Sequence, residues 1–164
     1  MDGFIHDYSS NCDTTLKTLF KEGRVFKVRG WNFTSKKWEI CNAGPVVVKE
    51  IDFCVKVITS SCSCILHVND RVLTSTINRL FCHTPSNLLL WMPLIQVKHP
   101  NTIAIVQPTL ESSKDPKHPG IYVDSRIYWE RIISIRQLDR QEIYTFSVDN
   151  VYNCAVSNVM QYKQ

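Results

Sequence analysis

Short apolar segments with a period of two dominate this sequence and restrict what it can form. Phe53, Val55 and Val57 follow this alternation, as do Tyr144, Phe146 and Val148. β-Branched and aromatic residues in such runs are typical of half-buried strands. Turn residues separate the runs, and no segment sustains a long helical period, although 14–20 fits either a short helical turn or a strand. The chain is therefore predicted to be all-β.

The length and composition fit one globular domain. With 164 residues, of which 44% are hydrophobic and 21% charged, the chain can bury a core, so residues 1–164 are expected to form a single domain. The segment 107–120 is polar and rich in Pro, Ser and Lys, which predicts an exposed loop. A net charge of +4 without a basic stripe argues against nucleic-acid binding.

No apolar stretch is long enough to span a bilayer, because the longest run, 88–92, ends at Pro93. The first seven residues lack the apolar core of a signal peptide. We therefore expect a soluble protein without membrane contact, in the cytoplasm or another reducing intracellular compartment. The seven cysteines are then expected to be free thiols.

Three segments follow one another in an order that points to a known family. They are Asp13–Val28, Ile58–Thr74 with its Arg-Val-Leu-Thr tail, and Tyr128–Met160. In this order they resemble the Hint (Hedgehog/intein) family, and a mini-intein in particular. The resemblance implies a horseshoe of short twisted antiparallel strands in a pseudo-twofold arrangement. It also places 107–120 at the point where larger inteins insert a homing endonuclease. This segment is too short to hold an endonuclease.

Protein splicing in this family begins with a nucleophilic Cys or Ser that lies four residues before an Asp-Thr pair. Here that position holds Ser9, so residues 1–8 are interpreted as an N-terminal extension. A serine hydroxyl is a weak nucleophile without an adjacent base. Cys12 is an alternative nucleophile, although it lies three residues after the position that the family uses. A purely structural role for Ser9 is the other alternative, because serine is a common turn residue.

The second block of the family carries a Thr and a His that assist the acyl shift. Here the Thr position holds His67 and the His position holds Asp70. An imidazole moves protons near neutral pH, and a carboxylate three residues later could orient it. Ser9, His67 and Asp70 are thus the candidate catalytic residues, against the alternative of a strand-end His and a turn Asp.

The C-terminal positions depart furthest from the family. Thr145 replaces an Asp, Tyr152 replaces a His, and Tyr162-Lys163 replaces the terminal His-Asn pair. Lysine has no side-chain amide that could cyclise, and a phenol with a pKa near 10 is a poor proton shuttle at neutral pH. Cleavage of the downstream bond is therefore expected to be absent.

A zinc site is the remaining candidate for a cofactor. Cys62, Cys64, Cys82 and His83 could supply four ligands. However, a Cys-x-Cys pair on a strand places both thiols on one face, where packing is the simpler explanation. No metal or other cofactor is expected.

Three functional hypotheses remain open. The first is a Hint domain that no longer splices and serves as a structural or interaction module, with a host or precursor protein as partner. The second is an autoprocessing domain with a residual, at most single-turnover, cleavage at Ser9. The third is an unrelated β-rich binding module.

Overall fold

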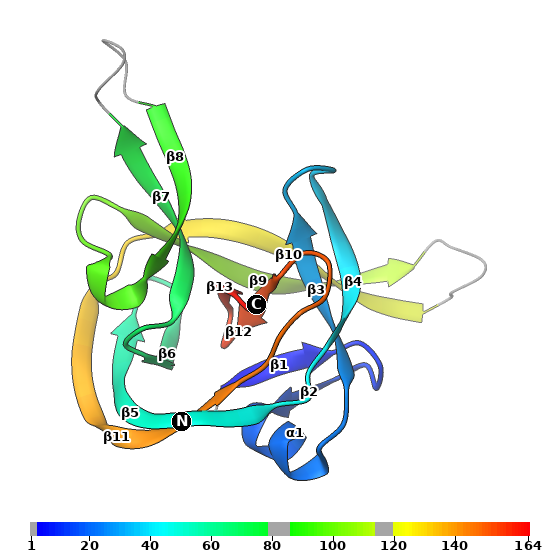
Figure 1. Cartoon of the computed structure of the whole chain (residues 1–164). Helices are drawn as coiled ribbons and strands as arrows, with labels where there is room; N and C mark the ends of the chain where they lie inside the picture. The colour runs from blue at the N-terminus through cyan, green and yellow to red at the C-terminus, as the bar shows by residue number, and fades with distance from the viewer. Residues whose placement is uncertain (1–2, 79–85, 114–119) are drawn as a thin grey trace.

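The strands of the computed structural model, which describes residues 3–78, 86–113 and 120–164, form four antiparallel sheets (Figure 1). The N-terminal half contains β1 (Phe4–Asp7), β2 (Cys12–Thr15), α1 (Leu16–Glu22), β3 (Phe26–Asn32), β4 (Lys37–Ala43), β5 (Val47–Ile58), β6 (Ser63–His67) and β7 (Arg71–Asn78). The C-terminal half contains β8 (Ser86–Pro93), the 3₁₀ turn η1 (Leu94–Gln96), β9 (Thr102–Ser113), β10 (Gly120–Glu130), β11 (Ser134–Thr145), β12 (Asn153–Val156) and β13 (Val159–Tyr162). The predicted all-β class is confirmed.

Two sheets organise the molecule. The larger has the order β10-β9-β13-β7-β8, with β12 paired to β13, and the smaller has the order β11-β5-β6. β1–β2 and β3–β4 are separate two-stranded ribbons. The last hairpin, β12–β13, lies at the centre of the molecule in Figure 1, with the curved β5–β11 pair below and to one side of it.

The segment 14–20, which the sequence left open between helix and strand, contains both. Thr15 ends β2 and caps α1, because its side chain accepts a hydrogen bond from the Thr18 N–H at 3.2 Å. The helix ends at Gly23, which has a φ of 64° and donates its N–H to the Leu19 carbonyl. α1 buries Leu16 and Leu19 in the core, so packing rather than length sustains this short helix.

Residues 3–8 are part of the fold, which corrects their interpretation as an extension. Ile5 is only 2% exposed and packs in one core cluster with residues of α1, β3 and β12. Phe4 and Ser157 bind each other twice, because the Ser157 N–H donates to the Phe4 carbonyl at 2.8 Å and the Phe4 N–H contacts the Ser157 hydroxyl at 3.4 Å. Burial of apolar surface therefore holds the first strand against the last hairpin.

The predicted loop at 107–120 is largely a hairpin instead. β9 continues to Ser113 and pairs with β10 from Gly120 onward, while 114–119 lie outside the described residues. The composition was misleading because a long antiparallel ladder satisfies the backbone of polar residues as well as apolar ones. Pro108 fits there because this part of β9 pairs only with β10, which leaves one edge of the strand free.

Within the described part of the chain, no helix has the length and apolar character needed to cross a membrane.

The burial of Ile5 gives a test of whether the first strand belongs to the domain. We expect Ile5→Ala to lower the free energy of unfolding by about 2–5 kcal/mol, because it leaves a cavity in the core. Phe4→Ala on the same strand is the matched control, since Phe4 is 40% exposed, and should cost clearly less. Urea unfolding followed by tryptophan fluorescence measures both, and equal small effects would mean that residues 3–8 are dispensable.

Candidate functional site

His67 and Asp70 lie at the two ends of the turn between β6 and β7. The His67 N–H donates to Asp70 Oδ2 at 3.0 Å, and the Asp70 N–H donates to the His67 carbonyl at 3.1 Å. The structure therefore brings these two predicted residues together. The contact is made through the backbone of His67, so Asp70 fixes the turn and does not orient the imidazole.

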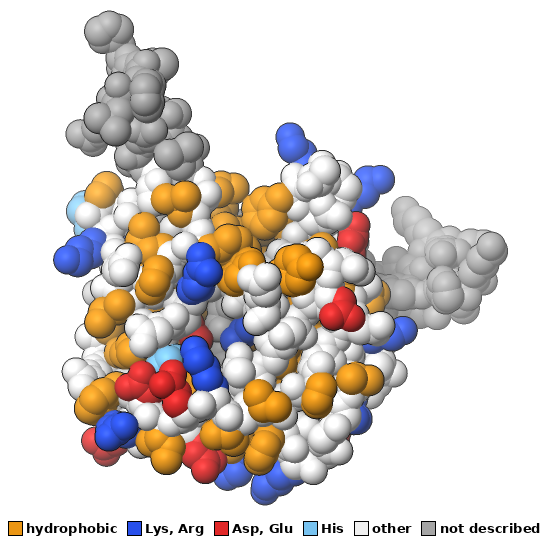
Figure 2. Space-filling view, in the orientation of Figure 1, with side chains coloured by type: hydrophobic (Ala, Val, Ile, Leu, Met, Phe, Trp, Pro, Cys, Tyr) orange, Lys and Arg blue, Asp and Glu red, His pale blue; other side chains and the backbone are white. Residues whose placement is uncertain are grey.

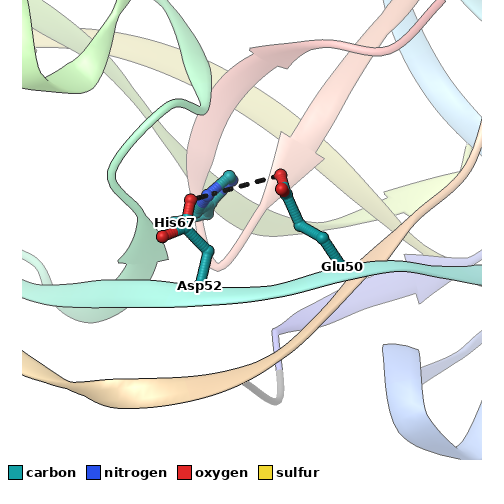
Figure 3. A group of neighbouring side chains, drawn as sticks. All are labelled: Glu50, Asp52 and His67. Atoms are coloured by element: carbon teal, nitrogen blue, oxygen red, sulfur yellow. Dashed lines mark hydrogen bonds and ion pairs between the residues drawn. The ribbon is translucent and has the colours of Figure 1, made fainter.

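The imidazole of His67 is oriented by a strand that the sequence analysis did not single out. Its Nε2 lies 2.8 Å from Asp52 Oδ2 and 3.9 Å from Glu50 Oε1, both on β5 (Figure 3). The ring is only 2% exposed. Hydrogen bonds from His67 and from the Phe53 N–H lower the pKa of Asp52, so this carboxylate is ionised at neutral pH.

A sequence signal for Asp52 and Glu50 existed but was incomplete. Residues two apart on a strand point to the same face, so the pair was predictable as a carboxylate face of one strand. Their contact with His67 depends on the register of β5 against β6, in which Cys54 pairs with His67. The turn 59–62 that joins the two strands sets this register, and the sequence analysis did not use that turn.

The C-terminal positions that the resemblance singled out differ in burial: Lys163 lies in the interior, whereas Tyr152 is 44% exposed. Lys163 is buried, its N–H donates to the Tyr152 carbonyl at 2.7 Å, and its carbonyl accepts from the Val148 N–H at 2.9 Å. The Lys163 ammonium lies 5.3 Å from the centre of the Phe146 ring, a cation–π arrangement. Thr145 is the last residue of β11, and the described structure records no hydrogen bond or ion pair between its side chain and Lys163.

Tyr162 connects the C-terminal hairpin to the turn at Asp70. Gln161 pairs with Val72 of β7, and the guanidinium of Arg71 lies 4.9 Å from the centre of the Tyr162 ring. The Tyr162 hydroxyl donates to Gln164 at 2.6 Å. Tyr162 therefore contacts a cation through its ring and an amide oxygen through its hydroxyl.

Ser9 lies in the turn of the β1–β2 hairpin, where it binds the buried Asp7. Its hydroxyl and its N–H both donate to Asp7 Oδ1, at 2.5 and 2.9 Å. Arg24 Nη2 lies 2.8 Å from Asp7 Oδ2, and the Lys27 N–H adds a longer bond at 3.3 Å. Burial by itself would raise the pKa of Asp7, but these hydrogen bonds outweigh it and hold the pKa well below its usual value of 3.8.

The structure does not assemble the three predicted catalytic residues into one site. No recorded hydrogen bond or ion pair among the described residues joins Ser9 to His67 or Asp70, and the hairpin and the β6–β7 turn belong to different sheets. The alternative nucleophile, Cys12, is exposed at the start of β2, where its thiol contacts the Ser10 hydroxyl at 3.1 Å. It has no basic partner in the described structure either.

The predicted zinc ligands are only partly visible. Cys62 and Cys64 are buried free thiols joined by a hydrogen bond, and this hydrogen bond together with burial raises the pKa of the Cys64 thiol. Cys62 Sγ also lies 3.7 Å from the Ser157 carbonyl. Cys82 and His83 lie outside the described residues. Within the described chain, these two thiols have no third metal-ligating group close to them.

Comparison with solved structures identifies the fold. The DnaB intein from Synechocystis sp. PCC 6803 matches over 99% of this chain and 95% of its own, with 17% identity and a TM-score of 0.68. A mutant of the Ssp DnaB mini-intein gives 18% identity and a TM-score of 0.70 over 99% and 96% of the two chains. The DnaX mini-intein from Spirulina platensis gives 12% and 0.65 over 99% and 96%. The chain has the Hint fold of a mini-intein.

No protein-family model matches the sequence, and no curated protein matches it. The predicted Hint fold is thus confirmed by shape, and the hypothesis of a β-rich module unrelated to it is wrong. In this Hint fold, Ser9 follows a complete half-buried strand, so the alignment that placed Ser9 first in the domain does not agree with the structure.

The Asp7 network predicts a pH-dependent stability. Because the pKa of Asp7 is lowered on folding from 3.8, its contribution is fully present well above pH 3.8 and is lost as the pH falls further toward the folded value. Asp7→Asn should destabilise the chain by about 2–3 kcal/mol at pH 7, because a charged acceptor of several hydrogen bonds is lost.

Thermal unfolding of both proteins between pH 7 and pH 2 measures this effect, and the difference between them should shrink below pH 4. Asp13→Asn on the neighbouring strand is the control, because the Asp13 side chain is 72% exposed. A constant gap across the whole pH range would contradict the role given to the Asp7 charge.

Proposed function

We propose that this chain is a Hint domain that no longer splices and that serves as a structural or protein-interaction module of a host or precursor protein. The observation that carries the proposal is Lys163, which stands where the resemblance places the cyclising Asn. Its side chain has no amide that could attack the backbone carbonyl. Its ammonium is packed over Phe146, which is a structural use of the position.

The state of Ser9 supports the loss of the first step as well. An acyl shift at this residue requires a base for the hydroxyl and an acid for the leaving peptide nitrogen. The group that contacts both atoms is Asp7. With its lowered pKa, Asp7 is a weak base, and in its ionised form it has no proton to give.

The backbone around Ser9 also supports a structural role. The Tyr8 N–H donates to the Lys27 carbonyl at 2.9 Å, so the residue before the proposed bond is tied to β3. Asp7, Ser9 and Ser10 together form a turn in which both hydroxyls donate to one carboxylate. We therefore interpret Ser9 as the residue that satisfies a buried charge.

Mass spectrometry of the intact chain tests the proposal. We expect a single full-length mass after a day with dithiothreitol or hydroxylamine, with the chain alone or fused to reporters at both ends. Ser9→Ala should leave that mass profile unchanged, because the unmodified chain undergoes no acyl shift at Ser9.

Ser10→Ala is the matched control, since Ser10 contributes to the same turn. Cleavage after Tyr8 that disappears in Ser9→Ala but persists in Ser10→Ala would overturn the proposal in favour of a residual N-terminal reaction. Release of the C-terminal reporter would overturn it in favour of an active C-terminal step.

A further inference from the structure

Three potential metal ligands converge where β5 passes β6. His67 Nε2, Asp52 Oδ2 and Glu50 Oε1 lie within 4.8 Å of one another (Figure 3). No other group of three His, Cys, Asp or Glu ligands this close occurs in the part of the chain that is described. We propose that Glu50, Asp52 and His67 form a binding site for a zinc ion.

The distances suit a zinc ion. Zinc binds imidazole nitrogen and carboxylate oxygen at about 2.0–2.2 Å in tetrahedral geometry, which separates neighbouring ligand atoms by about 3.3–3.6 Å. Here Nε2 is 2.8 Å from the Asp52 oxygen and 3.9 Å from the Glu50 oxygen, on either side of that range. Shifts of several tenths of an ångström in the side chains would admit the ion, and the exposed Glu50 side chain is free to make them.

The ligands are held by a second layer of hydrogen bonds. Asp52 Oδ1 accepts the Phe53 N–H at 2.7 Å, which leaves Oδ2 for the ion. Asp70 accepts the His67 N–H and so fixes the end of β6 that carries the imidazole. Such outer contacts orient the ligands of protein metal sites and raise their affinity.

The three ligands differ in burial, so the site is closed on the side of His67 and open to solvent on the side of the carboxylates. His67 is 2% exposed, whereas the side chains of Asp52 and Glu50 are 25% and 42% exposed. Figure 2 shows acidic and basic side chains gathered around a histidine on this face, where apolar side chains are otherwise scattered. An ion could therefore enter from solvent and retain water in its fourth position.

Two cations face the carboxylates and would compete with the ion. Lys49 Nζ lies 3.8 Å from Glu50 Oε1, and Arg140 acts on Asp52 from β11. Lys49 is exposed, so its pair with Glu50 contributes little and is easily replaced. On binding, zinc would take the Nε2 position that hydrogen-bonds Asp52 in the free protein, and a proton on Nε2 would pass to the buffer.

The chain contains its own control for an ordinary histidine–carboxylate pair. His6 Nδ1 lies 2.8 Å from Asp13 Oδ1, the same separation as between His67 and Asp52. The other ring nitrogen of His6 contacts Asn11, so no second carboxylate completes that pair. If any histidine–carboxylate pair bound zinc weakly, the His6–Asp13 pair and the His67–Asp52 pair would therefore both bind it.

Calorimetric titration of the reduced full-length chain with zinc chloride tests the proposal. We expect one equivalent of zinc to bind through the cluster. His67→Gln, Asp52→Asn and Glu50→Gln should each weaken binding by at least about tenfold. His6→Gln should leave the affinity unchanged. Glu50→Gln is the variant least expected to disturb folding, because the Glu50 side chain is half exposed, so a loss of binding in this variant reports on the site itself.

Cobalt(II) substitution separates this site from the thiols. Nitrogen and oxygen ligands give only weak visible bands, whereas thiolate ligands add intense near-ultraviolet charge transfer. We expect weak bands that are lost in Glu50→Gln and unaffected by Cys62→Ser. No binding, an affinity unchanged in Glu50→Gln, or a thiolate spectrum lost in Cys62→Ser would each overturn the proposal. The outcome is independent of whether the chain cleaves itself.

Discussion

The attachment of the first strand to the last hairpin is the constraint on which the rest of the structure depends. Phe4 and Ser157 exchange backbone and hydroxyl contacts, and Ile5 enters the core beside residues of β12. The same strand ends at Asp7, whose carboxylate gathers the hairpin turn, Arg24 and the start of β3. One short strand thus connects the N-terminal ribbons to the centre of the molecule.

This arrangement shows what holds the fold together. Packing and backbone pairing define the Hint fold here, and neither requires the proton-transfer groups of splicing. Lys163 places a buried cation over an aromatic ring, and Tyr162 contacts Arg71 through its ring. Both side chains therefore have local partners in the fold.

Local patterns predicted the strands well because burial on one face imposes a period of two. Val55 and Val57 are buried in β5 on either side of the less buried Lys56, as their alternation indicated, whereas Phe53 of the same series is 41% exposed. Segments whose partners lie far away were harder to predict. The polar residues 107–113 became strand through pairing with β10. Residues 1–8 were interpreted as an extension because the core neighbours of Ile5 are distant in sequence. The orientation of His67 by Asp52 depended on strand register, so residue spacing pointed to Asp70 instead.

The contact between Phe4 and Ser157 also has a consequence for how the protein is made. It spans 153 positions of the chain, so Phe4 cannot make this contact until the segment that contains Ser157 has been synthesised. Contacts of such long range close large loops before they gain any stability, which slows folding. Until then, an emerging chain would leave the apolar face of its first strand without its neighbours in β12, and exposed apolar surface of this kind favours aggregation.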